Sequence, residues 1–282
     1  MTTRREFVGS LAAAALAAPT LRGLAALAVS PPRRLGPLGV QLYTVRDAMR
    51  RDVEGTLARV RSIGYREVEF AGYFGRTPAQ IKAALGANGL SAPSAHLPLE
   101  AFSTKLGDTL ETAEGIGHQW LVFPGLDAED HRIERYDEVA DILNAAGEEA
   151  ARHGMRVGYH THDVDFHPWD GGETPLERLL HRLDPRYADI ELDLYWCVKG
   201  GSEPHLWFDR HPGRFPLVHV KDAGPAPDFK MADVGAGAMD WRAIFAQRRR
   251  AGMLHYFVEH DEPAEPWASI SASFRYLSHL SV

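Results

Sequence analysis

Histidine and carboxylate side chains recur in this sequence at the ends of short apolar runs. The segment Val157-Gly158-Tyr159-His160-Thr161-His162-Asp163 carries two imidazoles two residues apart. Alternate residues of a β-strand point to the same face, so a strand here would direct His160 and His162 into one pocket. Three later runs also end in metal-ligand residue types, at Asp193, His219 and Glu259. We therefore predict that these four segments converge on one divalent metal ion.

The residue types of this set indicate which ion and which chemistry. Imidazole and carboxylate donors together suit Mn²⁺, Co²⁺, Zn²⁺ or Fe²⁺, whereas an all-oxygen set suits Mg²⁺ or Ca²⁺. The predicted ligands are His160, with His162 as the alternative from the same strand, and Asp193, His219 and Glu259. An ion held in this way can polarise a carbonyl and acidify the neighbouring C–H. The competing interpretation is that Asp193 and Glu259 form a buried salt bridge with Lys221 or Arg46.

Eight strand–helix units follow one another along the chain and would position these residues. Hydrophobic periodicity and Gly and Pro punctuation predict the units. The expected strands are 38–43, 65–70, 92–96, 120–123, 155–162, 188–194, 216–221 and 254–259. The expected helices are 52–63, 78–85, 100–114, 134–153, 175–183, 204–210, 241–250 and 266–280. This number of units in about 250 residues predicts a single-domain (β/α)8 TIM barrel. A doubly wound open sheet is the competitor, but the first strand lacks the glycine-rich turn typical of it.

Active sites of such barrels lie at the C-terminal ends of the strands, where further polar residues of this chain fall. We assign acid–base roles to Glu259, His162, His96 and Lys221, and substrate contacts to Gln41, Glu69, Trp196 and Asp222. A lone histidine at a strand end is as often a structural, hydrogen-bonded residue, which is the alternative for His96. Asp163, Asp165 and His167 can equally be loop caps.

Composition narrows the classes of protein to consider. The chain has 282 residues, 45% of them hydrophobic, and a formal net charge of -7. This acidic balance opposes general nucleic-acid binding, which needs basic surface. The single cysteine, Cys197, excludes an internal disulfide and a thiolate metal cluster, and we expect it to fill the core.

The first 28 residues have the pattern of an export signal. Thr3-Arg4-Arg5-Glu6-Phe7-Val8 is a twin-arginine pattern, and an apolar run of small residues and the site Ala26-Leu27-Ala28 follow it. The run is too short and alanine-rich to suit a stable membrane span. We therefore expect a signal peptide over 1–28, a linker over 29–36 and the barrel over 37–282. The twin-arginine machinery would deliver the protein to the periplasm or the exterior.

Several motifs together resemble the xylose-isomerase-like TIM barrels, the family of sugar phosphate isomerases/epimerases that shares a superfamily with endonuclease IV. The resemblance covers roughly residues 37–280. It rests on these segments: Gln41-Leu42-Tyr43-Thr44-Val45-Arg46, Val68-Glu69-Phe70-Ala71-Gly72, Tyr159-His160-Thr161-His162-Asp163, Leu192-Asp193-Leu194-Tyr195-Trp196, His219-Val220-Lys221-Asp222, Val234-Gly235-Ala236-Gly237 with Asp240-Trp241, and Val258-Glu259-His260-Asp261.

This resemblance implies a metal held by Glu, Asp, His and Glu from strands five to eight. The last three correspond to Asp193, His219 and Glu259, and His160 stands in place of the strand-five glutamate. In the ketose epimerases that glutamate is one of two paired bases, so the resemblance points instead to the branch of inosose dehydratases and enzymes of keto-sugars or keto-glycosides. An unphosphorylated carbohydrate is the expected substrate. The alternatives are an endonuclease-IV-like phosphodiesterase and an inactive periplasmic sugar-binding barrel. The sequence leaves the oligomeric state open, including a homo-oligomer.

Overall fold

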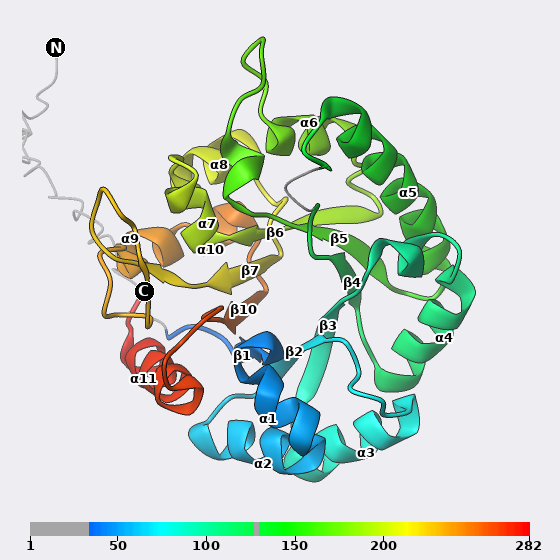
Figure 1. Ribbon diagram of the computed structural model, residues 1–282, viewed down its shortest axis with the longest axis vertical. Coiled ribbons are helices and arrows are strands. Elements are labelled where there is room, and N and C mark those ends of the chain that lie inside the picture. The colour runs from blue at the N-terminus through cyan, green and yellow to red at the C-terminus, as the bar shows by residue number, and fades with distance from the viewer. Residues whose placement is uncertain (1–33, 127–129) are drawn as a thin grey trace, which may run out of the picture. The chain divides into compact units, whose positions relative to one another are not determined.

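A closed barrel of eight parallel strands forms the centre of the computed structural model, which describes residues 34–126 and 130–282. Helices surround the barrel in chain order (Figure 1). The strands pair in the order β1-β10-β7-β6-β5-β4-β3-β2, so β1 and β10 close the ring. The fold is therefore the predicted single-domain TIM barrel. The twin-arginine pattern and most of the predicted linker lie outside the described residues.

The barrel strands are short and end near the predicted positions. They are β1 Leu38–Gln41, β2 Glu67–Ala71, β3 Ser91–His96, β4 Trp120–Phe123, β5 Arg156–His160, β6 Ala188–Asp193, β7 Leu217–Val220 and β10 His255–Val258. The helices are α1 Arg46–Arg51, α2 Val53–Ile63, α3 Pro78–Asn88, α4 Leu106–Ile116, α5 Ile133–Arg152, α6 Pro175–Arg182, α7 Leu194–Lys199, α8 Pro204–Arg210, α9 Trp241–Ala246, α10 Arg248–Ala251 and α11 Pro266–His279.

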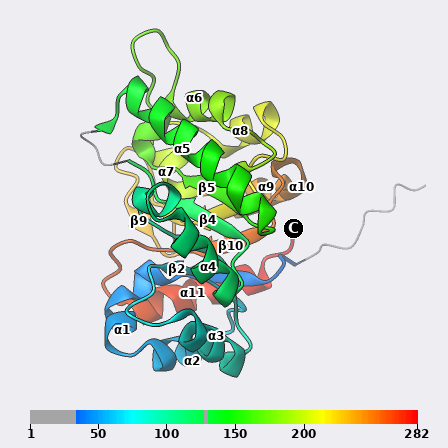
Figure 2. The ribbon, with the colours of Figure 1, turned by 90° about the vertical axis from the view of Figure 1, so that its right-hand side faces the viewer.

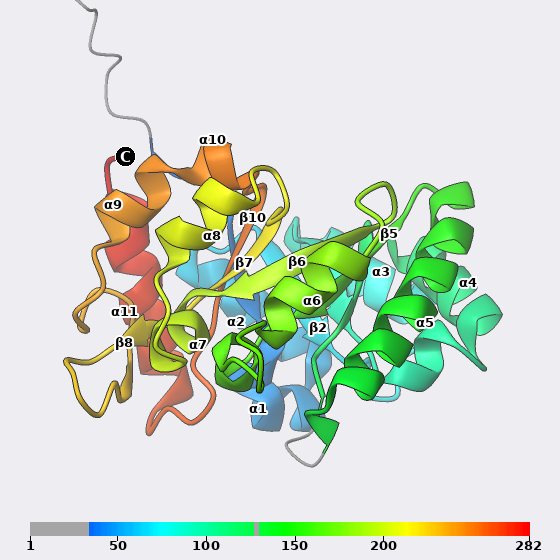
Figure 3. The ribbon, with the colours of Figure 1, turned by 90° about the horizontal axis from the view of Figure 1, so that it is seen from above.

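Local sequence signals explain where these helices begin and end. Thr77 caps α3 by accepting from the Gln80 N–H, Gln80 reciprocates, and Pro78 occupies the first turn. The helix ends at Gly89, whose φ of 58° lies in the left-handed region that glycine adopts without strain. The helices pack as a ring outside the strands, with α5 against both β5 and α6 (Figures 2 and 3).

Some elements differ from the prediction. Strand β5 ends at His160, and His162 precedes a short 3-10 helix, Asp163–Phe166, instead of continuing the strand. The helix expected over 241–250 is divided into α9 and α10. Helices α1 and α7 and the two-stranded hairpin of β8 Asp222–Ala223 and β9 Met231–Ala232 were not predicted, because each is too short to show a hydrophobic period.

The barrel interior is layered from the strand starts to the strand ends. Near the strand starts, Asp189 binds Arg156 and Trp120, and Glu67 lies 2.8 Å from His255 Nδ1. A small apolar layer follows, formed by Trp120, Val122, Leu217 and Phe257. Above it, at the C-terminal ends, the interior becomes charged. The larger apolar core lies between the strands and the helices. Within the described residues, no helix is long and apolar enough to cross a membrane.

Candidate metal centre and active site

A cavity of about 560 Å³ opens at the C-terminal ends of the barrel strands. Imidazole, amine and carboxylate groups line one part of it, and Tyr43 and apolar residues line the rest. The lining residues are Tyr43, Ala71, Gly72, His96, Leu97, Pro98, Pro124, His160, His162, Lys221, Glu259 and Asp261. The volume is in the range of sites that enclose a small organic ligand.

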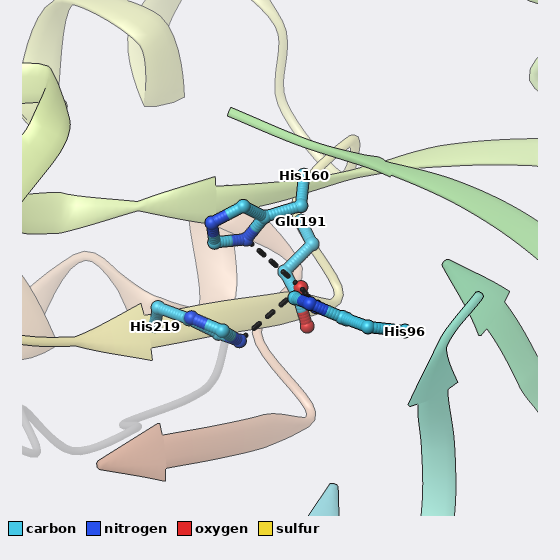
Figure 4. A group of neighbouring side chains, drawn as sticks. All are labelled: His96, His160, Glu191 and His219. Carbon is cyan, nitrogen blue, oxygen red and sulfur yellow. Dashed lines mark hydrogen bonds and ion pairs between the residues drawn. The ribbon is translucent and has the colours of Figure 1, made fainter. Parts of the chain in front are cut away.

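Below this cavity, three imidazoles surround the carboxylate of Glu191 (Figure 4). Its Oε2 atom lies 2.6 Å from His96 Nε2, 3.0 Å from His160 Nδ1 and 3.2 Å from His219 Nε2. His160 and Glu191 are register partners on β5 and β6, which explains their contact. Glu191 is fully buried, and its Oε1 has no hydrogen-bond partner among the described residues. A ligand atom from each of the four residues lies within reach of a single ion.

The sequence prediction missed Glu191, because it treated β6 as an apolar strand that ends in Asp193. Asp189, Glu191 and Asp193 alternate with Ile190 and Leu192. This period of two places all three carboxylates on the interior face of β6. The alternation is a signal from which Glu191 could have been found.

Glu69 supports the same group from β2. Its Oε2 accepts from Gln41 Nε2 at 2.8 Å and lies 2.7 Å from His219 Nε2, and its Oε1 accepts from Ser94 Oγ at 2.5 Å. Gln41 and Glu69 are fully buried and do not line the cavity. This geometry gives them a supporting position beneath His219, and their predicted contact with substrate gains no support from it.

A second group contains three of the four predicted metal ligands. Asp193, His219 and Glu259 place one ligand atom each within reach of a single ion. His219 Nδ1 lies 2.8 Å from Glu259 Oε2 and 3.8 Å from Asp193 Oδ2. The fourth predicted ligand, His160, turns Nδ1 toward Glu191 but leaves Nε2 3.7 Å from Asp193 Oδ2. His219 therefore belongs to both groups, one through each ring nitrogen.

Lys221 also lies in this second group. Its ammonium is 2.9 Å from Asp193 Oδ2, 2.7 Å from Glu259 Oε2 and 2.8 Å from Asp261 Oδ1. The salt bridge considered as the alternative to a metal site is therefore present for Lys221. Arg46 instead donates to the Asp261 main-chain carbonyl. Asp261 was not among the predicted site residues, although it stands two residues beyond Glu259 and lines the cavity.

Burial and neighbouring charges oppose each other at the ionisable groups of the site. Burial disfavours the charged form of His219, but Glu191 and Glu259 outweigh it and raise its pKa well above the usual range. Burial likewise opposes charge on Lys221, and its three carboxylate neighbours hold its pKa high. Burial raises the pKa of Asp193 to about 6 despite Lys221. The site is thus an enclosed region in which carboxylates outnumber cationic partners.

His162 lies on the cavity wall beside His160, with the two rings 4.9 Å apart. Asp165 holds its backbone by accepting from the His162 N–H at 2.7 Å, and Tyr136 and Tyr159 donate to the other oxygen of Asp165. The alternative role of Asp165 as a loop cap is thereby confirmed. Burial lowers the pKa of His162 to about 3, and Lys221 adds to this effect. Trp196 packs beside His162 at a ring separation of 5.7 Å.

Asp222 faces away from the cavity. Its carboxylate accepts from the Trp241 Nε1 at 2.8 Å and from the backbone N–H groups of Ala223, Gly235, Gly237 and Met239. The carboxylate is buried and saturated with donors, so the geometry assigns it to holding the chain between β9 and α9. The predicted substrate contact at Asp222 is not supported by this arrangement.

The donor set fits a divalent cation. Asp193, Glu259 and Asp261 contact the one ammonium, whereas Glu69 and Glu191 contact His96 and His219. With all five carboxylates ionised, their negative charge exceeds the charge of Lys221 and two protonated histidines. Buried excess charge of this kind is costly unless a cation compensates it. Asp193, His219 and Glu259, with His160 Nε2 beside them, are the residues placed to hold such an ion.

Comparison with known proteins agrees with the barrel fold. The family model described as the xylose isomerase-like TIM barrel matches residues 57–277. The chain belongs to this family. It is 27% identical over 161 residues to an inosose dehydratase from Geobacillus thermodenitrificans, a match that covers 51% of each protein. The chain thus spans about half the length of this curated relative.

Solved structures show the same fold over most of the chain. A sugar phosphate isomerase/epimerase from Parabacteroides distasonis superposes with a TM-score of 0.74 at 25% identity, covering 89% of this chain and 95% of that one. The probable 3-DHS dehydratase from Bacillus anthracis superposes with a TM-score of 0.68 at 14% identity, covering 86% and 99%. At that identity the second likeness concerns the fold alone.

Proposed function

We propose that this protein is a divalent-metal-dependent enzyme that removes a proton next to the carbonyl of an unphosphorylated sugar, keto-sugar or keto-glycoside. The observation that carries the proposal is the convergence of Asp193, His219 and Glu259. Glu259 lines the cavity at the strand ends together with His96 and His162. Membership of a family of sugar isomerases, epimerases and dehydratases supports it.

Metal binding and proton transfer are assigned to different residues according to their positions. Asp193, His219 and Glu259 would hold the ion with His160, and the bound ion would polarise the substrate carbonyl. His162 and His96 line the cavity, and Nε2 of His96 lies 2.6 Å from Glu191 Oε2. We assign proton transfer to these two imidazoles. After proton removal, reprotonation at a different carbon or face gives isomerisation or epimerisation. Loss of a leaving group β to the carbonyl gives dehydration or elimination, which the similarity to an inosose dehydratase favours.

The charge of the cavity supports an unphosphorylated substrate. Among the described lining residues, Lys221 is the only lysine or arginine, and its ammonium is already engaged by three carboxylates. A phosphate dianion beside Glu259 and Asp261 would meet repulsion without a free cation to offset it. The same deficit of cations disfavours the alternative of a phosphodiester substrate.

We further propose that the protein is exported by the twin-arginine route. Support for this comes from the Arg4-Arg5 pattern and the small-residue segment that follows it. Replacing both arginines by lysine should retain the protein in the cytoplasm, as fractionation of the producing cells would show. Unchanged export would contradict the proposal.

Solvent-deuterium exchange followed by NMR tests the proposed chemistry. Candidate keto-sugars and 3-keto-glycosides are incubated in D2O with the protein and Mn²⁺, Co²⁺ or Zn²⁺. We expect deuterium at the carbon next to the carbonyl, or an elimination product, and loss of both with chelator or in Glu259→Gln. Exchange that persists with chelator would contradict the metal requirement, and its absence across the whole panel would contradict the reaction class.

A further inference from the structure

Lys221 occupies the position in the site where a bound cation is also expected. The ammonium contacts Asp193 Oδ2 at 2.9 Å and Glu259 Oε2 at 2.7 Å. Both residues also supply ligand atoms to the group with His219 that could hold an ion. Lys221 is 1% exposed, so its positive charge is committed to these neighbours and not to solvent.

A third carboxylate offers the same ammonium a different partner. Asp261 Oδ1 lies 2.8 Å from Lys221 Nζ, and Asp261 does not belong to either ligand group. Its side chain is 27% exposed and lines the cavity, whereas Asp193 is fully buried. The Lys221 ammonium therefore contacts the carboxylates of Asp193 and Glu259 and also the carboxylate of Asp261 at the edge of the cavity. It can leave Asp193 and Glu259 and still keep its ion pair with Asp261.

From this geometry we propose that Lys221 is a built-in counter-cation that a divalent ion displaces from Asp193 and Glu259 toward Asp261. The inference rests on the proposed metal requirement. Without the ion, the ammonium neutralises two buried carboxylates whose other partners are His219 and, for Asp193, the Trp196 N–H. With the ion bound, the same two carboxylates have a stronger partner, and the amine is presented at the cavity wall.

The Lys221 ammonium and the divalent ion compete for the same two carboxylates, Asp193 and Glu259. Each cation therefore weakens the binding of the other by the same free energy. A protein without the Lys221 charge should bind the ion more tightly and depend on it more for stability. If Lys221 only oriented the ligands, the change in metal affinity would have the opposite sign. Its removal would then loosen the carboxylates and weaken metal binding.

The test measures Mn²⁺ binding by calorimetry, and the loss of the free-Mn²⁺ EPR signal, for the full chain and Lys221→Gln. We expect the dissociation constant to fall by about tenfold or more in Lys221→Gln, a typical size for coupling between two sites. The matched control is Lys199→Gln, which removes a lysine whose amine donates to the Asp228 carbonyl at 2.7 Å. It should leave Mn²⁺ affinity unchanged.

Melting temperatures provide a second readout. Lys221→Gln should melt lower than wild type without metal and gain more on adding Mn²⁺. If the single variant does not fold without metal, the double variant Lys221→Gln/Asp193→Asn should restore folding. The introduced amide would keep an oxygen for the Trp196 N–H, and the unpaired charge would be removed.

Equal or weaker Mn²⁺ binding by Lys221→Gln, with normal binding by wild type, would overturn the inference but leave the metal requirement intact. Absence of binding by both would overturn the metal requirement and the inference with it.

Discussion

At the scale of single residues, His219 connects the two halves of the site. Its Nε2 faces Glu69 and Glu191, and its Nδ1 faces Glu259 and Asp193. A neutral imidazole has one N–H and can satisfy carboxylates on only one side. The ring is therefore either an imidazolium between carboxylates or a metal ligand on the Nδ1 side with Glu69 orienting it from the other.

A histidine outside the site gives a prediction about pH. His118 is 4% exposed, its Nδ1 donates to the Ala92 carbonyl at 2.7 Å, and burial lowers its pKa to about 4. The unfolded chain takes up the proton below about pH 6.5 and the folded chain only near pH 4. The free energy of unfolding should therefore fall as the pH drops through that window, by about 2 kcal/mol between pH 7 and 5 from this residue.

His118→Asn removes this pH-dependent contribution to the free energy of unfolding and keeps a side-chain N–H for the Ala92 carbonyl. Urea denaturation at pH 7 and pH 5 should show that the variant loses less stability than wild type between these two values. His153→Asn, at an exposed position, is the control and should follow wild type. Identical pH dependence of His118→Asn and wild type would show that His118 is not buried in the neutral form.

Residue-scale prediction from the sequence worked where a polar residue ends an apolar run. His160, Asp193, His219 and Glu259 were found in this way, and the structure brings them together. Glu191 and Asp261 were missed because one lies inside a strand and the other lies beyond it. Only the pairing of β5 with β6 shows that Glu191 faces His160. Such a contact between distant segments depends on register, which periodicity alone does not determine.

At the scale of elements, one buried carboxylate organises the segment between β9 and α9. Asp222 accepts four backbone N–H groups and the Trp241 indole N–H, and Trp241 itself is 1% exposed. Gly237 approaches so closely that a Cβ there would lie 2.2 Å from Asp222 Oδ1. The segment is therefore built around the carboxylate, and it leads directly into α9.

Asp222→Ala should lower the free energy of unfolding by about 3 kcal/mol, because several buried donors lose a charged acceptor together. Asp240→Ala is the matched control, since that aspartate caps α9 at an exposed position by accepting from the Ala243 N–H. Loss of this cap should cost only about 1 kcal/mol. Chemical denaturation measures both, and equal costs would contradict the organising role of Asp222.

The long amphipathic helices could be predicted from sequence. Of the short helices, α8 was predicted with its observed bounds, whereas α1 and α7 were not. Helix α5 covers twenty residues and repeats its apolar face several times. Helix α7 has six residues and follows β6 without a loop, with Asp193 as its N-cap. Asp193 therefore both caps α7 and faces the metal group. The sequence pattern predicted the second of these roles for Asp193 and not the first.

At the scale of the whole molecule, the barrel concentrates charge where it closes. Each strand carries at most a few ionisable residues, but closing the ring brings carboxylates from β2, β6 and the end of β10 around His219 of β7. The number of strand–helix units predicted this architecture. The excess of carboxylates over cations is a property of the closed barrel and appears only after the strands are paired.

A protein that encloses such a site should be more stable with its ion than without it, because a ligand of the folded state alone stabilises that state by mass action. Addition of Mn²⁺, Co²⁺ or Zn²⁺ to chelator-treated protein should raise the melting temperature for at least one of these ions. Glu259→Gln should reduce the increase. An increase of the same size in Glu259→Gln would place the stabilising ion elsewhere.

Metal analysis of the purified full-length protein is the most direct test that the barrel mouth is a metal centre. We predict one divalent ion per chain in wild type, with metal content close to zero after dialysis in Glu259→Gln and unchanged content in His118→Asn. Wild-type protein without divalent metal, even after incubation with Mn²⁺, Co²⁺ or Zn²⁺, would contradict the claim. So would Glu259→Gln that retains metal as well as wild type.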